Sequence, residues 1–476
     1  MTQVALLWLR SDLRLQDNQA LSWAVEHGYK VLPYYHHNEH SDEWQRGGAS
    51  KWWLHYALQD LEEQITQLGG QLLLGNPEYT SADAIQEVLQ QHQVRAVLWN
   101  RCYEPHRIKE DTQIKAALKS QGYQVKSFNS NTLFDPTKTF NKSGSPFKVF
   151  TPFWKSLAQQ EVAYAEPLDE TSISWASPQL QRRLDDLSLL PTIGWDAGMH
   201  SSWEVSRSAG LARLGQFSQA RAIVYGDYRD RPDLEGTSKL SPYLHFGQLG
   251  PREVLHQLRS LSHPDVESGI TRQLFWREFG QHLLYHFPHS PTQALYEKYQ
   301  LFPWEENDQF LRAWQRGETG YPIVDAGMRE LWTTGWMHNR VRMIVGSLLV
   351  KHLLQPWQAG AEWFWDTLVD ADLGNNTMGW QWIAGSGADG APYFRVFNPI
   401  TQGQKFDITG DYVRKWCPEL AHLPNKYLHC PFDAPDLELR AAGIILGRNY
   451  PAPIIGHKEG RQKALDAFAA FKEISA

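Results

Sequence analysis

The hydrophobic pattern of the first 130 residues alternates between two periodicities. Stretches with helical spacing, such as 51–68 with apolar Trp53, Leu58 and Leu61, separate short continuous apolar runs. Strands that alternate with helices in this way predict a parallel, doubly wound sheet that helices cover on both faces. The apolar runs lie at 4–9, 31–35, 71–74, 96–99 and, more weakly, 124–128.

The pattern weakens after these runs. From about residue 135 to residue 204 the chain is polar, rich in Ser, Thr and Lys, and interrupted by proline. A long segment of this composition predicts a connector that runs over the surface.

Helical spacing dominates the rest of the chain, and strand-like runs are nearly absent. We therefore predict an α/β domain at 1–130, a connector at 131–204 and an all-helical domain at 205–476. The expected helices lie at 209–225, 241–246, 252–261, 270–287, 307–317, 323–334, 339–354 and 360–368.

The bulk composition is that of a soluble globular protein, with 42% hydrophobic and 21% charged residues in 476. This length is typical of two or three domains. Apolar runs stay well short of the roughly 20 residues that a membrane span needs. The first apolar run has no basic segment before it, so we expect neither a membrane span nor a signal peptide.

The three cysteines, Cys102, Cys417 and Cys430, are widely spaced and form no CxxC pair. This usage favours a reducing cytoplasm and disfavours a disulfide framework or a zinc site. We expect no metal.

Charge and tryptophan content leave two questions open. The net charge of −7 disfavours nucleic-acid binding as a global property, but a local basic face such as 329–351 would suffice. The 21 tryptophans either pack in the core or serve stacking and electron transfer.

The stretch EGTSKLSPYLHFG at 235–247 combines hydroxyl groups with a helix start. It predicts either an anion-binding site or a simple helix cap with proline in the first turn.

Two predicted helices carry polar groups on one face. Asn339, Arg342 and Met343 share a face, and Arg342 needs a carboxylate partner, for which Asp370 and Asp372 are candidates. On the other helix, Gln273 and its neighbours suit either recognition of a flat polar group such as a base or a plain amphipathic helix.

Residues 370–382, DADLGNNTMGWQW, fit neither an apolar core helix nor an ordinary surface loop. Together with six other motifs, this stretch closely resembles the photolyase/cryptochrome family, and in particular bacterial cyclobutane pyrimidine dimer photolyases. The resemblance covers about residues 4–470. The other motifs are RSDLRLQDN, EGTSKLS, FWREF, GYPIVDAGMREL, GWMHNRVRM and APYFRVFNPITQGQKFD.

The resemblance implies that the helical domain binds FAD and performs catalysis, and that the α/β domain holds an antenna chromophore. Asn376 matches the position that faces flavin N5, and Arg342 would pair with Asp370 beside the ring system. The resemblance assigns the phosphates to Tyr225, Thr237, Ser238, Lys239, Leu240 and Ser241, and the rest of the flavin pocket to Arg277, Asn339, Ala371 and Asp372.

Trp380, Trp357 and Trp304 match the tryptophan chain through which family members carry an electron between flavin and surface. A flipped lesion would enter a pocket, because chemistry on a base requires it to leave the stack; photolyases are among the named examples of this rule. The resemblance assigns the pocket to Gln273, Trp276, Asn339, Met343 and Trp382, and the contacts to DNA phosphates to Arg395, Asn398, Gln402 and Lys405.

One position departs from the dimer photolyases, which usually carry glutamate where this chain has Gln273. Glutamine keeps the hydrogen bonds but cannot transfer a proton. Glutamine at the position of Gln273 resembles the (6-4) photolyases. Those proteins carry a paired-histidine motif, however, where this chain has His338-Asn339-Arg340. Asn376 favours repair, since plant-type cryptochromes usually carry aspartate at this place.

The resemblance thus implies a cytoplasmic, monomeric lyase that acts on pyrimidine dimers in UV-damaged DNA by electron transfer from reduced FAD. A cryptochrome photoreceptor without repair activity and a (6-4) photolyase are the alternatives. The antenna is either methenyltetrahydrofolate or 8-hydroxy-5-deazaflavin, and the tandem Trp52-Trp53 indicates aromatic stacking at that site.

Overall fold

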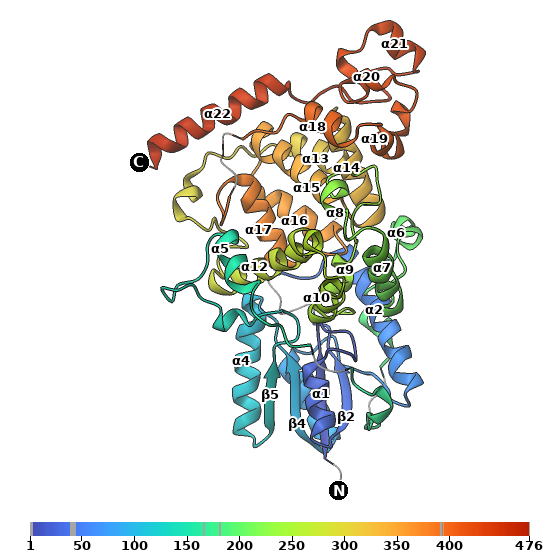
Figure 1. Cartoon of the computed structure of the whole chain (residues 1–476), viewed down its shortest axis with the longest axis vertical. Helices are drawn as coiled ribbons and strands as arrows, with labels where there is room; N and C mark the ends of the chain where they lie inside the picture. The colour runs from blue at the N-terminus through green and yellow to red at the C-terminus, as the bar shows by residue number, and fades with distance from the viewer. Residues whose placement is uncertain are drawn as a thin grey trace.

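The computed structural model describes residues 3–38, 44–164, 167–179, 182–390, 393 and 395–475. Its N-terminal part is built on one five-stranded sheet, in the order β3-β2-β1-β4-β5, with every neighbouring pair parallel (Figure 1). The predicted run at 71–74 contributes only two residues to the sheet. The strands are β1 (Val4–Leu9), β2 (Lys30–Tyr35), β3 (Leu73–Leu74), β4 (Val94–Asn100) and β5 (Gln124–Phe128).

Helices cover both faces of this sheet. Successive strand residues point to opposite sides, and Ala5 and Leu7 pack in the same core as α1 and α2, whereas Leu6 and Trp8 pack with α3 and α4. The predicted doubly wound architecture is confirmed. The four helices are α1 (Gln19–Glu26), α2 (Gly48–Gln67), α3 (Ser81–Gln91) and α4 (Pro105–Ser120).

The motif RSDLRLQDN, which follows β1, joins the sheet to the helical part. The Leu13 N–H donates to Phe246 O at 3.1 Å, and the buried Arg14 donates from Nη1 to Gly247 O at 2.9 Å. Gly247 has a φ of +69°, and a Cβ there would lie 2.1 Å from Ser11 O. Glycine is therefore required where the two parts meet.

The segment between the two parts follows the surface of both. Val31 and Trp175 form an isolated parallel bridge, and the buried Glu278 accepts hydrogen bonds from the Leu133 and Phe134 N–H groups at 2.7 and 3.3 Å. The domain boundaries at 130 and 204 stay predictions. The segment contains α5 (Phe150–Leu157), α6 (Ala197–Ser202) and the 3₁₀ turns Pro136–Lys138, Glu170–Ser172 and Leu184–Leu187.

The rest of the described chain consists of helices and the loops that join them, and its only strand-like element is an isolated bridge between Leu446 and Tyr450. The longest C-terminal helix, α22, runs along the upper left side of the molecule in Figure 1. The helices are α7 (Arg207–Ala220), α8 (Tyr225–Tyr228), α9 (Ser241–His245), α10 (Pro251–Ser260), α11 (Pro264–Val266), α12 (Arg272–His286), α13 (Asp308–Arg316), α14 (Pro322–Thr334), α15 (Asn339–Ser347), α16 (Trp357–Thr367), α17 (Leu373–Ala384), α18 (Pro399–Phe406), α19 (Asp411–Trp416), α20 (Asn425–Leu428), α21 (Asp436–Ala441) and α22 (His457–Ile474), with 3₁₀ turns at Glu297–Leu301, Pro418–Leu420 and Pro431–Asp433.

Two predicted helices are interrupted by π-helical turns. The turn Glu267–Thr271 precedes α12, and the turn Leu348–His352 continues α15, where the sequence predicts uninterrupted helices. π-helical turns often mark functional sites, and both adjoin helices that line the cavity described next.

The stretch DADLGNNTMGWQW forms α17, which the hydrophobic pattern does not predict. Asp372 caps this helix by accepting a hydrogen bond from the Asn375 N–H at 2.8 Å. The helix packs against α12, α15 and α16, and several of its side chains also face a cavity. Because neighbours surround it in this way, no single apolar stripe develops along its sequence.

Candidate functional site

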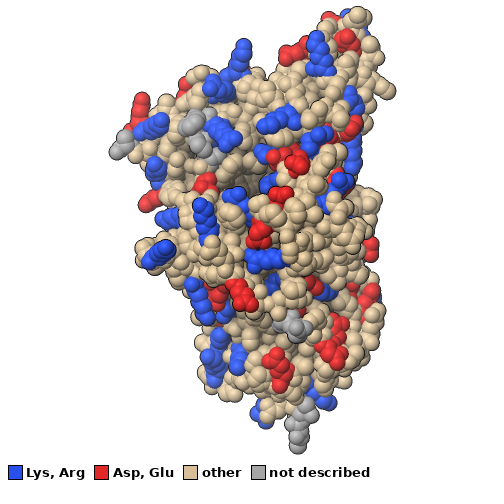
Figure 2. Space-filling view, in the orientation of Figure 1, with Lys and Arg blue, Asp and Glu red and all other residues tan. Residues whose placement is uncertain are grey.

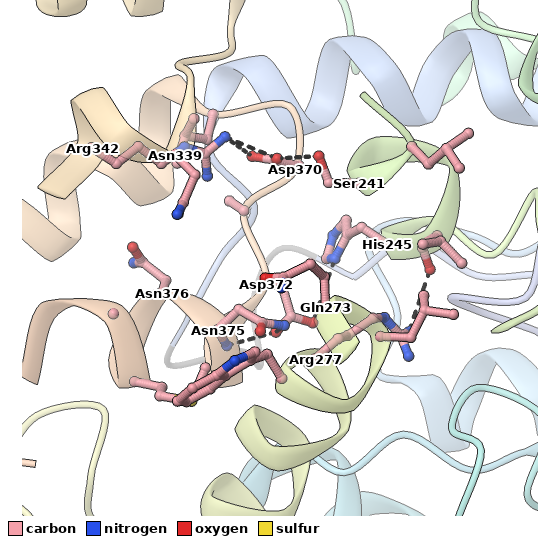
Figure 3. A pocket seen from close by; sticks show the side chains of 18 of the residues that line it. Ser241, His245, Gln273, Arg277, Asn339, Arg342, Asp370, Asp372, Asn375 and Asn376 are labelled. Carbon is pink, nitrogen blue, oxygen red and sulfur yellow. Dashed lines mark hydrogen bonds and ion pairs between the residues drawn. The ribbon is translucent and has the colours of Figure 1, made fainter. Parts of the chain in front are cut away.

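A cavity of about 530 Å³ lies among the helices of the C-terminal part (Figure 3). Side chains from α9, α12, α15 and α17, and from the segment that links α16 to α17, line it. In Figure 2, basic side chains surround a hollow in the upper half of the molecule.

An ion pair with a hydroxyl partner forms one wall of the cavity. Arg342 Nη2 lies 3.1 and 3.0 Å from Asp370 Oδ1 and Oδ2, and Ser241 Oγ donates to Asp370 Oδ2 at 2.6 Å (Figure 3). Arg342 Nε also donates to Met337 O at 2.8 Å. The predicted partner of Arg342 is therefore Asp370 and not Asp372.

Asp372 belongs to a second network. Its Oδ1 accepts hydrogen bonds from the Asn375 N–H and from Asn375 Nδ2, and its Oδ2 accepts one from Gln281 Nε2 at 2.8 Å. Burial alone would raise the pKa of the Asp372 carboxyl, but His245, Arg277 and the Asn375 N–H outweigh it and lower that pKa to about 2. Asp372 is therefore a fixed negative charge beside the cavity.

Arg277 connects the cavity to the N-terminal part. Its Nη1 donates to Asn131 O at 2.9 Å and lies 3.2 Å from Glu278 Oε1, and its Nη2 donates to Leu244 O at 3.4 Å. These contacts hold the start of the connector, α9 and α12 together around the cavity.

Asn376 and Trp380 lie one turn apart on α17, and both line the cavity. Asn376 Nδ2 donates to Ala361 O at 2.9 Å, which leaves the carbonyl oxygen Oδ1 available to a ligand. Trp380 is buried, and its ring packs edge-on against Phe364 with centroids 5.0 Å apart.

The side chains predicted to hold a lesion also meet in this cavity. Gln273, Trp276, Met343 and Trp382 all line it, together with Asn339. Gln273 Nε2 donates to Gly269 O at 3.3 Å, so its Oε1 is the atom left to accept a hydrogen bond.

Predicted cofactor residues divide into two groups. Ser238 and Leu240 line the cavity with Ser241, but the Ser241 hydroxyl is already bound to Asp370. The cavity-lining set does not include Tyr225, Thr237 or Lys239. The sequence predicts these cavity-lining residues as cofactor-binding: Ser238, Leu240, Ser241, Arg277, Asn339, Arg342, Asp370, Ala371, Asp372 and Asn376.

Lys239 and Tyr225 have other neighbours. Lys239 Nζ pairs with Glu235 at 3.1 Å, and the Tyr225 ring packs edge-on against Phe217 with centroids 5.9 Å apart. Arg229 lies over the Tyr225 ring at 5.2 Å and itself lines the cavity, so it is the cation that Tyr225 positions there.

Trp357 and Trp304 lie outside the cavity lining but share one core with Trp380. Trp357 is buried at the start of α16, and Trp304 is half-buried at the edge of the same cluster. The set therefore includes one indole that lines the cavity, one buried indole and one that reaches the edge of the same cluster.

The predicted phosphate-binding residues lie on and before α18. Arg395 and Lys405 are exposed and Gln402 is half-buried. The Asn398 side chain accepts a hydrogen bond from the Ile400 N–H at 3.0 Å and so caps α18.

Several lining residues were not predicted. Arg229, His245 and Asn375 bring polar groups to the cavity, and Phe364 and Met378 bring apolar surface. His245 lies near the end of the stretch EGTSKLSPYLHFG, and Asn375 lies inside DADLGNNTMGWQW, so both belong to motifs that the sequence singles out. The hydrophobic pattern of the sequence holds no signal for Arg229 or Phe364.

Gln381, also without a predicted role, is structural: it donates hydrogen bonds to Ser290 O and Gln293 O at 2.6 and 2.9 Å.

The α/β part shows two features that bear on a second chromophore. Trp52 and Trp53 are both buried, and Trp53 Nε1 donates to Gln248 Oε1 at 2.9 Å, so their rings serve packing between α2 and the helical part. The carboxyl ends of β1 and β4, where such sheets usually bind ligands, hold an ion pair between Arg10 and Asp111 at 2.6 Å.

The residues present fit a flavin cofactor. The cavity volume lies within the roughly 300–1,000 Å³ usual for cofactor and ligand sites. Its lining combines apolar surface from Leu244, Leu274 and Phe364 with a small number of polar groups, including the ion pair and the free Asn376 Oδ1. This is the composition that binds a flat, partly polar ring system.

Among the described residues, no group of three or more His, Cys, Asp or Glu side chains is arranged to hold a metal ion. Within the same ranges, no helix combines the length and the apolar character needed to cross a membrane.

Comparison with known proteins gives consistent matches over the whole chain. A family model described as DNA photolyase matches residues 5–172, and one described as FAD binding domain of DNA photolyase matches residues 270–470. The chain is 43% identical to deoxyribodipyrimidine photo-lyase of Agrobacterium fabrum, with 99% of each chain covered. It is 34% identical to Cryptochrome-1 of Arabidopsis thaliana, with 99% of this chain and 71% of that protein covered.

A solved structure agrees with these matches. The bacterial class III photolyase from Agrobacterium tumefaciens superposes with a TM-score of 0.94 at 41% identity, covering 99% of this chain and 98% of that one.

Proposed function

The chain belongs to the photolyase/cryptochrome family, and from that premise we propose that it is a light-driven deoxyribodipyrimidine photo-lyase. The observation that carries this proposal is that one cavity holds both sets of groups the reaction needs. The ion pair of Arg342 and Asp370 with Asn376 forms one set, and Trp276, Met343 and Trp382 form the other.

The first set would hold FAD. When bound and reduced, FAD supplies on illumination the electron that splits the cyclobutane ring of the dimer, and it takes the electron back afterwards. Arg342 and Asp370 would stay paired beside the ring system, Asn376 would present Oδ1 as a hydrogen-bond acceptor, and Arg229 and Ser238 would bind the phosphates. Asp372 would keep its interactions with the protein when FAD binds, because its two carboxylate oxygens already accept hydrogen bonds from Asn375 and Gln281.

The second set would hold the flipped lesion. Trp276 and Trp382 supply indole surface for stacking, and Met343 supplies a polarisable thioether. Gln273 Oε1 can accept a hydrogen bond from a pyrimidine N–H, because its Nε2 is held by Gly269 O. Arg395, Gln402 and Lys405 would bind phosphates and so position the strand without reading its sequence.

Trp380, Trp357 and Trp304 would conduct an electron inward from the surface. The proposal is supported by their shared core, in which Trp380 lines the cavity and Trp304 is partly exposed.

The experiment that tests the function uses the purified protein with its FAD reduced. Illumination with a thymine cyclobutane dimer in a short DNA duplex should restore the two thymines, which chromatography measures. Intact dimers in the light, together with normal photoreduction of FAD, would favour the cryptochrome photoreceptor. Repair of a (6-4) lesion alone would favour that class of photolyase, which Gln273 resembles.

A second chromophore, a single subunit and a cytoplasmic location are further parts of this proposal. Methenyltetrahydrofolate and 8-hydroxy-5-deazaflavin remain the two candidates, and the absorption spectrum of the extracted chromophores would distinguish them. The ion pair of Arg10 and Asp111 lies at the carboxyl ends of β1 and β4, and we propose that the chromophore binds elsewhere on the α/β part. Sedimentation of the purified protein tests the single subunit.

A further inference from the structure

The connector supplies the support for one wall of the cavity. The ring of Phe150, in α5 of the connector, stacks on the indole of Trp276, in α12, with centroids 3.5 Å apart and planes at 9°. Phe150 is fully buried, whereas Trp276 is half-buried and lines the cavity. One side of the indole is therefore covered by the connector, and the surface that it presents to the cavity lies away from Phe150.

A cation extends this stack. The guanidinium of Arg272 lies 5.3 Å from the Phe150 ring centre and 4.7 Å from that of Trp154, which is also in α5. Arg272 Nε is buried without a hydrogen-bond partner in the described chain, so the two aromatic rings contribute to holding the side chain. Three side chains from two elements, Phe150 and Trp154 of α5 and Arg272 of α12, thus interlock behind Trp276.

Neighbouring packing restrains Phe150 in turn. Phe150 contacts Phe279 edge-on with centroids 5.8 Å apart, and it belongs to a buried aromatic cluster that also contains Phe153 and Phe147. Because its neighbours hold Phe150 on several sides, the Phe150 ring cannot follow a movement of Trp276. Phe150 therefore determines the plane that the Trp276 indole adopts.

The geometry points to Phe150 as a positioning residue for damage recognition, acting through Trp276. This inference rests on the proposed function, in which Trp276 stacks on the flipped lesion. An indole whose plane is already set loses less conformational freedom when the lesion binds, and such pre-organisation raises affinity. The connector thus belongs to the recognition apparatus as well as linking the two parts of the chain.

The test compares two leucine variants of the same helix in the FAD-loaded protein. Phe150→Leu removes the ring behind Trp276, and Phe153→Leu removes a ring of the same cluster that packs on Phe147 and Phe279. Binding is measured to a duplex with one thymine cyclobutane dimer and to the same duplex undamaged. Phe150→Leu should weaken binding to the dimer about 3- to 10-fold, the range expected of one aromatic pair. Binding to undamaged DNA and repair at saturating DNA should not change.

A double-mutant cycle shows whether the effect passes through Trp276. In a Trp276→Leu background, Phe150→Leu should cause no further loss of dimer affinity. Equal dimer affinity in Phe150→Leu and Phe153→Leu would overturn the inference, and so would a further 3- to 10-fold loss in the Trp276→Leu background. If Phe150→Leu does not fold, Phe150→Met takes its place in the same comparisons. A wild-type protein that does not prefer the dimer would overturn the proposed function itself, a result that these variants cannot produce.

Discussion

A Cβ atom added to Gly360 would lie 2.1 Å from the indole ring of Trp380. The two residues belong to α16 and α17, which pack against each other, and the missing side chain is what lets the indole lie against the α16 backbone. Gly360→Ala should therefore displace Trp380 and lower the free energy of unfolding by about 1–3 kcal/mol, as overpacking usually does. Urea unfolding measures this, and the rate of FAD photoreduction should fall with it.

The matched control is Gly215→Ala in α7, where an added Cβ meets nothing within 4 Å. Alanine in the interior of a helix is more favourable than glycine by about 0.5–1 kcal/mol, so this variant should be slightly stabilised. Wild-type stability and photoreduction in Gly360→Ala would contradict the role of this close approach.

Trp380→Phe should suppress photoreduction of oxidised FAD but leave repair intact once FAD is reduced chemically. The reason is that phenylalanine preserves most of the contact with Phe364 but is much harder to oxidise than an indole. Loss of the oxidised flavin absorption under blue light measures the first effect. Trp23→Phe in α1 is the control, and photoreduction at equal rates in both variants would remove Trp380 from the electron path.

The ion pair of Arg342 and Asp370 should matter more than the hydroxyl attached to it. Asp370→Asn leaves a partly buried guanidinium without its counter-charge, which should cost roughly 3 kcal/mol of stability and release FAD. Ser241→Ala removes one hydrogen bond to the same carboxylate and should cost about 1 kcal/mol. Urea unfolding and flavin fluorescence measure both, and equal effects in the two variants would contradict this order.

Stability should fall as the pH rises towards neutrality because of Glu330. Burial is the main cause that raises the pKa of its carboxyl to about 7, although the Tyr412 hydroxyl and the His338 N–H lower it. Between its ordinary pKa, about 4.5 in the unfolded chain, and pH 7, the folded protein binds more protons than the unfolded chain. The contribution of this group is therefore fully present below about pH 4.5 and is lost by up to roughly 3 kcal/mol as the pH passes 7.

Glu330→Gln should remove this pH dependence, because glutamine can still accept the hydrogen bond that Tyr412 donates at 2.6 Å. Urea midpoints of the variant and the wild type should agree at pH 4.5 and diverge in favour of the variant at pH 8. Glu362→Gln, at an exposed position of α16, should follow the wild type. A urea midpoint that changes by the same amount between pH 4.5 and pH 8 in Glu330→Gln and in the wild type would count against this assignment.

The sequence predicts the sheet well because its strands are compact apolar runs, each bounded by polar residues. It fails at α17, where the helix has protein or cavity on several sides and so lacks a single apolar stripe. At Trp52-Trp53 the indicated stacking on an antenna chromophore stays a prediction; both indoles are buried where α2 meets the helical part.

Most of the candidate site could be predicted only through the resemblance. The apolar helix face of Arg342 predicts a carboxylate partner, and the resemblance selects Asp370 over Asp372; in the structure Arg342 and Asp370 lie 3.0 Å apart. Phe150 lies far along the chain from Trp276, which it supports, and no local pattern marks Phe150 or Arg229. Contacts of this kind depend on how the connector and α8 return to the cavity, which is a property of tertiary packing.

Lys405 and Arg395 should contribute to DNA affinity in a way that salt reveals. Both side chains are exposed on or just before α18, where the proposal places the DNA phosphates. Each phosphate contact releases counterions, so Lys405→Ala should lower the slope of log affinity against log salt by about 1, and equally for damaged and undamaged duplex. Lys119→Ala at the end of α4 removes a charge from the far side of the sheet and should leave the slope unchanged. A slope that is the same in Lys405→Ala and the wild type would place the phosphates elsewhere, and a loss confined to damaged DNA would make Lys405 a contact to the lesion.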